Sequence, residues 1–183
     1  MNAFIKLGVI EPLAQALYQQ GIRIPTVIQQ ASIPAIFKGK DIIGRSETGT
    51  GKTLAYLLPL VQRVDVKKGG TQVLIMTPTR ELAKQIFDVL RPFAILMEAD
   101  VADIIGGPTI ENQIQKLKRE PHIIIGTPGR LLDHIRRRSL DLSGVKTVVL
   151  DEADQMLAAG FREDIDALVD ETPKKRAVLL FSA

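Results

Sequence analysis

The stretch GRSETGTGKT, residues 44–53, joins an apolar run to a segment with helical spacing. Glycines at positions 49 and 51 let the backbone turn its N–H groups inward, and a helix that begins directly after them adds the positive end of its dipole. A strand, a glycine-rich turn and a helix in this order are the context in which such a spacing binds phosphate. A glycine-rich turn with a solvated lysine is the plainer alternative, and the flanking strand and helix argue against it.

Apolar runs rich in Val, Ile and Leu recur along the chain and predict strands that are buried on both faces of a sheet. These runs cover residues 41–44, 72–77, 101–107, 122–126, 147–151 and 177–182. Helical spacing follows Thr79 and Phe161, so the order predicts an α/β fold: a mostly parallel sheet with helices on both faces. Residues 1–40 instead predict two helices that end at Gly21 and Gly39 and pack on the sheet.

Composition narrows the possible classes of protein. The 183 residues suggest one domain, and the absence of cysteine excludes disulfides and thiolate metal sites. A net charge of +3 is too weak to argue for nucleic-acid binding by bulk charge. No apolar stretch approaches the roughly 20 residues of a spanning helix, and Glu11 and Pro12 interrupt the first apolar segment. We therefore expect a soluble cytoplasmic protein without a membrane partner; the oligomeric state stays open.

Polar residues follow each predicted strand at once, in the clusters GRSETGTGKT, TPTR, GGPT, GTPGR, DEAD and SA. Ligands of open α/β sheets bind outside the carboxyl ends of the strands. Loops are polar in most proteins, so any one cluster has an ordinary structural explanation. Six clusters at six strand ends together predict a site along one edge of the sheet.

The glycine-rich turn supplies the groups that a nucleoside triphosphate needs. Lys52 would reach the β- and γ-phosphates, and the Thr53 hydroxyl would bind Mg²⁺. Ser46 stands where this pattern usually has glycine or alanine, a small change that should fit sterically. The residues predicted to surround the phosphates are Ser46, Glu47, Thr48, Gly49, Thr50, Gly51, Lys52 and Thr53.

VVLDEAD, residues 148–154, supplies the second half of such a site. Asp151 ends a buried strand and would hold the Mg²⁺ shell, while Glu152 could orient or deprotonate the attacking water. An acidic loop that caps the next helix is the alternative. It does not explain why the acids follow a buried strand directly. The two motifs together indicate a nucleoside triphosphatase that uses Mg²⁺, with Lys52, Asp151 and Glu152 as catalytic residues.

Further motifs give a specific resemblance. DEAD stands at residues 151–154, PTRELAKQ at 78–85, GG at 106–107 and TPGR at 127–130. With these motifs in this order, essentially the whole chain resembles the first core domain of DEAD-box RNA helicases. The resemblance implies a RecA-like P-loop domain over residues 1–183, with residues 1–40 as its adenine-reading preface. It also implies ATP-dependent activity on RNA.

The resemblance extends to nucleotide recognition through GIRIPTVIQ, residues 21–29. It implies that Gln29 reads the adenine edge, helped by Pro25 and Thr26. It also implies that Phe4, at the family's upstream phenylalanine position, lies beside the nucleotide. Ile22 replaces the aromatic residue that stacks on adenine. Val27 replaces a proline. Without an aromatic face, stacking worth roughly 1–3 kcal/mol is reduced to aliphatic contact, so weak nucleotide binding is expected.

The remaining clusters imply contacts with RNA, again by resemblance. Small residues, exposed N–H groups and arginines suit the phosphate backbone, so binding should not depend on RNA sequence. Arg80 could alternatively form a local pair with Glu81, and Arg136–Arg138 is interpreted mainly as a solvated helix end. The positions that match the RNA-contacting motifs of the family are Pro78, Thr79, Arg80, Gly106, Gly107, Thr127, Pro128, Gly129 and Arg130.

The family uses two such domains, and the second supplies arginines for phosphoryl transfer. The sequence stops at Ser182 and Ala183, which match the first two positions of a Ser-Ala-Thr motif; the resemblance implies that Ser182 meets Asp154 and couples nucleotide state to RNA. We expect the chain alone to bind nucleotide without turnover. An ATP-gated RNA clamp and a DNA helicase or translocase remain alternatives, whereas a GTPase is disfavoured because no Asn-Lys-x-Asp follows.

Overall fold

Six strands form one sheet in the computed structural model, which describes residues 2–183. Every pair of neighbouring strands is parallel, and the order across the sheet is β1-β6-β5-β2-β4-β3. The strands are β1 Ile42–Arg45, β2 Val73–Met76, β3 Val101–Ile104, β4 Ile123–Gly126, β5 Thr147–Asp151 and β6 Ala177–Ser182. All six predicted strands are confirmed.

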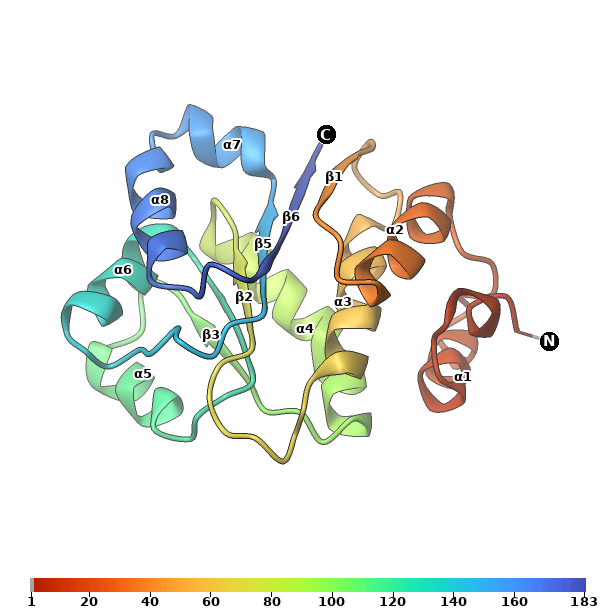
Figure 1. Cartoon of the computed structure of the whole chain (residues 1–183), viewed down its shortest axis with the longest axis horizontal. Helices are drawn as coiled ribbons and strands as arrows, with labels where there is room; N and C mark the ends of the chain where they lie inside the picture. Colours follow the sequence, from red (N-terminus) through yellow and green to blue (C-terminus); the bar gives the residue numbers. More distant parts are fainter. Residues whose placement is uncertain (1) are drawn as a thin grey trace.

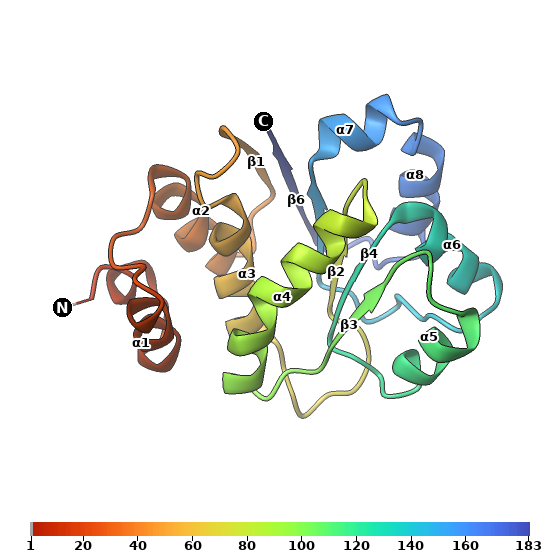
Figure 2. The same cartoon turned by 180° about the vertical axis from the view of Figure 1, so that it is seen from behind.

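The central strands are buried on both faces, which explains their continuous apolar sequences. In β2, Val73 and Ile75 belong to one hydrophobic cluster, whereas Leu74 and Met76 belong to the other. Helices α1 Glu11–Gln19, α2 Val27–Phe37, α3 Lys52–Arg63 and α4 Arg80–Leu96 contribute to the first cluster. Helices α5 Ile110–Leu117, α6 Pro128–Arg136, α7 Ala153–Ala158 and α8 Arg162–Asp170 contribute to the second (Figures 1 and 2).

Local sequence sets where several helices begin and end. Thr26, Thr79 and Thr109 accept a hydrogen bond from a backbone N–H of the first turn of α2, α4 and α5. The predicted stops at Gly21 and Gly39 are confirmed: both have positive φ, +82° and +69°, just after α1 and α2. A short 3₁₀ helix, Ile5–Leu7, precedes α1.

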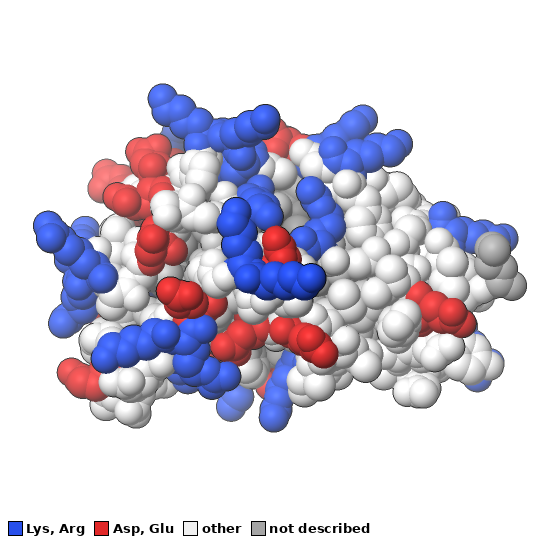
Figure 3. Space-filling view, turned by 60° about the horizontal axis from the view of Figure 1, so that its bottom comes forward, with Lys and Arg blue, Asp and Glu red and all other residues white. Residues whose placement is uncertain are grey.

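The parallel arrangement brings all the strand-end clusters to one edge, near the C-terminus in Figure 1. The opposite side, turned partly forward in Figure 3, carries acidic and basic side chains interspersed. The small net charge of +3 thus produces no patch of a single sign on that face. Within residues 2–183, none of the helices has the length and apolar character to cross a membrane.

Candidate functional site

Lys52 is the point where three strand-end loops meet. Its side chain is only 6% exposed, and Nζ donates to the carbonyl oxygens of Ser46 at 2.7 Å and Ser182 at 3.1 Å. The same nitrogen lies 3.9 Å from a carboxylate oxygen of Glu152. The glycine-rich turn, the acidic loop after β5 and the end of β6 are thus held around one ammonium group.

The turn itself has the backbone that its glycines predict. Gly49 and Gly51 have φ of +82° and +86°, in the left-handed region that favours glycine. The Ser46 and Thr50 hydroxyls lie 2.7 Å apart, and the Thr50 hydroxyl donates to the carbonyl oxygen of Glu47 at 2.6 Å. The Ser46 hydroxyl is therefore the donor to Thr50. The serine at this position fits the loop and adds a hydrogen bond inside it.

Gln29 contacts the glycine-rich turn of residues 44–53, the predicted phosphate loop. Its amide oxygen accepts from the Thr26 N–H at 2.9 Å, and its amide nitrogen donates to the carbonyl oxygen of Gly51 at 3.1 Å. A Cβ atom at position 51 would lie 2.4 Å from that nitrogen, so glycine is needed there for space as well as for φ. The side chain is 2% exposed. The N-terminal segment, residues 1–40, is thereby joined to the glycine-rich turn by the Gln29 side chain.

Tyr56 is a site residue that sequence reasoning missed. It is fully buried in α3, and its hydroxyl donates to Oδ2 of Asp151 at 2.7 Å. Burial, reinforced by the Asp151 charge, raises the pKa of Tyr56 well above its ordinary value, so the hydroxyl keeps its proton. The available signal was the residue type itself, because a tyrosine at an apolar helix position needs a partner for its hydroxyl.

The two acids of the loop after β5 differ in environment. Asp151 is 3% exposed, and burial raises its pKa although Tyr56 and a backbone N–H oppose that change. The N–H is that of Glu152, at 2.9 Å from Oδ1. Burial also raises the pKa of Glu152, and nearby Lys52 opposes it. Glu152 has φ +54°, in the left-handed region that is uncommon for non-glycine residues, and it precedes the first residue of α7.

The residues present suit Mg²⁺. Residues 2–183 contain no cluster of three or more His, Cys, Asp or Glu side chains that could enclose a metal ion. Mg²⁺ does not require one, because it commonly binds one or two protein oxygens together with water and substrate phosphates. Asp151 offers a buried carboxylate whose oxygens each retain a lone pair, and Thr53 lies at the second position of α3.

The predicted RNA-contacting residues also come together. A Cβ at Gly106 would lie 2.9 Å from Nε of Arg80, so the guanidinium of α4 packs against the Gly-Gly loop after β3. Nη1 of Arg130, from the first turn of α6, donates to the carbonyl oxygen of Pro108 at 3.1 Å. The loop thus lies between two arginines. Gly107 has φ +107°, which requires glycine.

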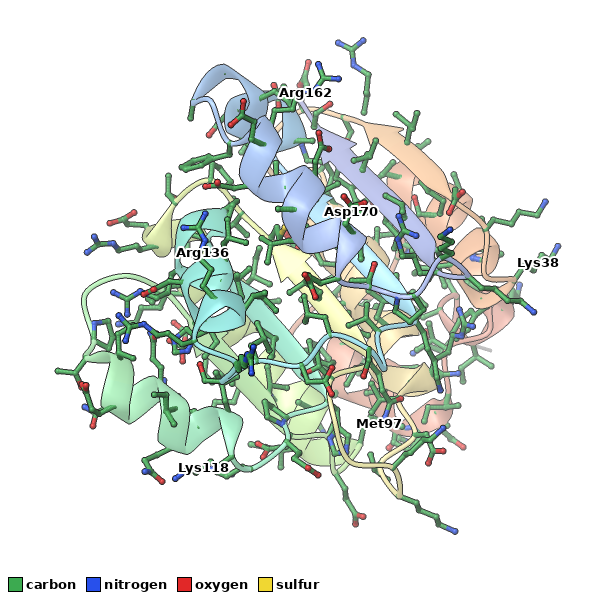
Figure 4. All side chains as sticks on the ribbon, turned by 60° about the vertical axis from the view of Figure 1, so that its left-hand side comes forward. Lys38, Met97, Lys118, Arg136, Arg162 and Asp170 are labelled. Carbon is green, nitrogen blue, oxygen red and sulfur yellow. The ribbon has the colours of Figure 1, made fainter. Side chains whose placement is uncertain are left out.

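The remaining positions of these motifs lie at helix starts. Thr79 caps α4, with Pro78 just before it. Thr127 is the residue before α6, and Pro128 is its first residue, where a missing N–H costs nothing. Gly129 follows and is exposed. By contrast, Arg136–Arg138 is exposed at the C-terminal end of α6, as the solvated-end interpretation predicts. Figure 4 labels the first of these arginines, Arg136.

Two expectations are not met. Ser182 and Asp154 share no hydrogen bond within residues 2–183; Asp154 is exposed, and the Ser182 carbonyl oxygen accepts from Lys52 and from the N–H of Ser46 at 3.2 Å. The end of β6 therefore meets the phosphate loop instead. Phe4 was expected beside the nucleotide, but it is 0% exposed in the hydrophobic core. The Phe4 ring therefore packs in the core cluster in this structure.

Comparison with known proteins agrees with this geometry. Residues 26–183 match the model of the family described as DEAD/DEAH box helicase. The chain belongs to this family. The similar DEAD-box ATP-dependent RNA helicase CshA of Geobacillus kaustophilus is 46% identical over 183 residues, and the ATP-dependent RNA helicase CshA of Listeria monocytogenes is 45% identical over the same length.

The fold also matches that of a solved DEAD-box protein. The crystal structure of a DEAD box protein from the hyperthermophile Methanococcus jannaschii has a TM-score of 0.94 and 38% identity, and it covers 99% of this chain. The chain accounts for 50% of that protein's chain, 39% of the Geobacillus relative and 35% of the Listeria relative. It thus corresponds to one RecA-like unit of longer DEAD-box proteins.

Proposed function

We propose that this chain is the ATP-binding half of an RNA-dependent ATPase that unwinds or remodels RNA. The observation that carries the proposal is the meeting of the phosphate loop, the DEAD loop and β6 at Lys52. The Gly-Gly loop and its two arginines lie along the same edge of the sheet. ATP and the RNA backbone would therefore bind side by side.

Each group has a role that its position supports. Lys52 would exchange its carbonyl partners for the β- and γ-phosphate oxygens, since its ammonium donates equally well to either. Asp151 and Thr53 would hold Mg²⁺, which when bound would neutralise developing charge on the phosphates. Glu152 would orient the attacking water and accept its proton. Gln29 keeps one amide hydrogen and one lone pair free for the adenine edge.

Turnover would need a second RecA-like domain. An arginine supplied to the transferring phosphate contributes on the order of 10³–10⁵ in rate, and we propose that it comes from the additional sequence that the longer relatives contain. The chain by itself would bind nucleotide without closing the catalytic site. RNA contacts through backbone phosphates would make binding independent of sequence.

Calorimetry and an ATPase assay on the 183-residue chain test the proposal. We expect ADP with Mg²⁺ to bind at least about tenfold more tightly than GDP, because the Gln29 amide matches adenine. We also expect no hydrolysis stimulated by RNA. Equal binding of the two nucleotides would contradict the adenine site. Robust turnover that is lost in Lys52→Ala would show that no second domain is required.

Ile22 offers a direct test of base stacking. It is partly buried against the core and stands at the position of the family's aromatic residue. Ile22→Phe should tighten ADP binding by about tenfold, because a ring adds stacking worth roughly 1–3 kcal/mol. Isothermal titration of the two proteins measures this difference. Ile24→Phe is the matched control, since Ile24 is 78% exposed; equal affinity of Ile22→Phe and the unmodified chain would refute the stacking role.

A further inference from the structure

A buried polar network lies between α5 and α6, on the side of the molecule that faces the viewer in Figure 4. Gln113 of α5 and His134 of α6 are both 0% exposed, although each carries polar side-chain atoms. Oε1 of Gln113 lies 2.9 Å from Nε2 of His134 and accepts from Nη1 of Arg130 at 3.0 Å. Buried polar side chains in proteins nearly always have hydrogen-bond partners, so the partners of these two residues show what the network holds in place.

Both the nitrogen and the oxygen of the Gln113 amide form hydrogen bonds. Its nitrogen donates to the carbonyl oxygen of Ile105 at 2.6 Å, while its oxygen receives Arg130 and His134. This pattern assigns the amide orientation and requires a proton on Nε2 of His134. Nδ1 of the same ring then accepts from the Ser139 hydroxyl at 2.7 Å. Burial lowers the pKa of His134, and the Arg130 charge lowers it further, so the ring stays neutral.

Arg130 is held in one orientation by this arrangement. The two hydrogens of Nη1 match two acceptors, the carbonyl oxygen of Pro108 at 3.1 Å and Oε1 of Gln113 at 3.0 Å. No hydrogen bond within residues 2–183 uses Nε or Nη2 of Arg130. Those two nitrogens form the side-on edge of the guanidinium, which can bind two oxygens of one phosphate.

The same contacts fix the Gly-Gly loop. Gln113 binds the carbonyl oxygen of Ile105 just before Gly106, and Arg130 binds that of Pro108 just after Gly107. Arg80 packs against Gly106 from α4. The loop is therefore pinned at both ends by one buried amide and its arginine partner, although glycine-rich segments are otherwise costly to order.

We propose that Gln113 is a positioning residue for binding of the RNA backbone. It locks the Arg130 guanidinium and the Gly-Gly loop into one rigid arrangement, and His134 holds the Gln113 amide in the required orientation. Gln113 contacts no RNA itself in this arrangement; it acts through Arg130. The inference rests on the proposed function, because it requires Arg130 to contact phosphate.

A double-mutant cycle on the 183-residue chain tests the proposal. The measurement is the Kd for a fluorescein-labelled oligouridylate at low ionic strength, read by fluorescence anisotropy. We expect Arg130→Ala to weaken binding by about 10- to 100-fold, as loss of a charge-assisted contact does. Gln113→Leu should weaken it by about three- to tenfold. The double variant should bind no more weakly than Arg130→Ala.

Controls separate positioning from folding. Gln115→Leu changes an exposed glutamine of the same helix and should leave the Kd unchanged. Urea unfolding shows whether each variant is folded under the assay conditions, and Gln113→Met, which is flexible and of similar size, replaces Gln113→Leu if the latter is unfolded.

The experiment distinguishes failure of the Gln113 positioning role from failure of the proposed RNA contact of Arg130. If Arg130→Ala weakens binding but folded Gln113 variants bind like the unmodified chain, Gln113 has no positioning role. If Gln113→Leu weakens binding further in the Arg130→Ala background, it acts by another route and the inference is wrong. If Arg130→Ala leaves the Kd unchanged, the proposed RNA contact of Arg130 is itself wrong and the inference fails with it.

Discussion

Replacing Lys52 with alanine should lower the affinity of the chain for ADP and Mg²⁺ by about 10- to 100-fold. This loss of affinity is what the removal of hydrogen bonds from a charged group costs, roughly 1.5–3 kcal/mol. Lys52 is the buried cation of the phosphate loop, and no other lysine or arginine donates a hydrogen bond to the loop carbonyls within residues 2–183. The substitution would therefore remove the ammonium group that is placed to bind the nucleotide phosphates.

Isothermal titration calorimetry of the purified variant measures this loss. Lys38→Ala is the control, because Lys38 is exposed and extends away from the fold in Figure 4. It removes the same charge from the molecule and should leave ADP affinity unchanged. Equal affinities of the Lys52→Ala and Lys38→Ala proteins would mean that the glycine-rich turn is not the phosphate site.

Replacing Tyr56 with phenylalanine should lower the free energy of unfolding by about 1–3 kcal/mol, the usual cost of leaving a buried polar group short of a partner. The ring would remain in the core beside Phe181, whose centroid is 5.2 Å from that of Tyr56. Only the donor to Asp151 would be removed. The affected carboxylate is 3% exposed, so water cannot readily replace the hydroxyl.

Urea denaturation followed by circular dichroism measures the change. Tyr18→Phe is the matched control, since Tyr18 is 54% exposed and its contact with Arg23 uses the ring face, which phenylalanine keeps. That variant should unfold at the urea concentration of the unmodified chain. An unchanged midpoint for Tyr56→Phe would show that the Tyr56 hydroxyl does not support Asp151.

The fold was largely predictable because the central strands are buried on both faces. All four residues of VLIM in β2 are buried, so the whole run is apolar. The alternation of such runs with helices implies that the strands are parallel. The predicted run at 101–107 was too long, because Gly106 and Gly107 leave the sheet to form the loop beside Arg80. β3 already ends at Ile104, and apolar spacing alone does not show that end because Ile105 is apolar as well.

The site was predictable only where a contiguous motif carried it. The phosphate loop and DEAD residues lie where their motifs placed them, at the ends of β1 and β5. Tyr56 and Asp151 are 95 residues apart, and Gln113 and His134 are 21 apart, so only folding reveals those pairs. Phe4 was assigned by position in a motif, and tertiary packing placed it in the core instead.

Hydrogen exchange of the chain, followed by mass spectrometry, tests most directly the claim that one edge of the sheet carries both ligands. With ADP and Mg²⁺, we predict slower exchange of the backbone amides of residues 46–53 and 151–154. With oligouridylate, the slower amides should lie in residues 79–81, 105–108 and 127–130. Protection by either ligand that is confined to the opposite edge, at residues 65–72 or 143–146, would contradict the account.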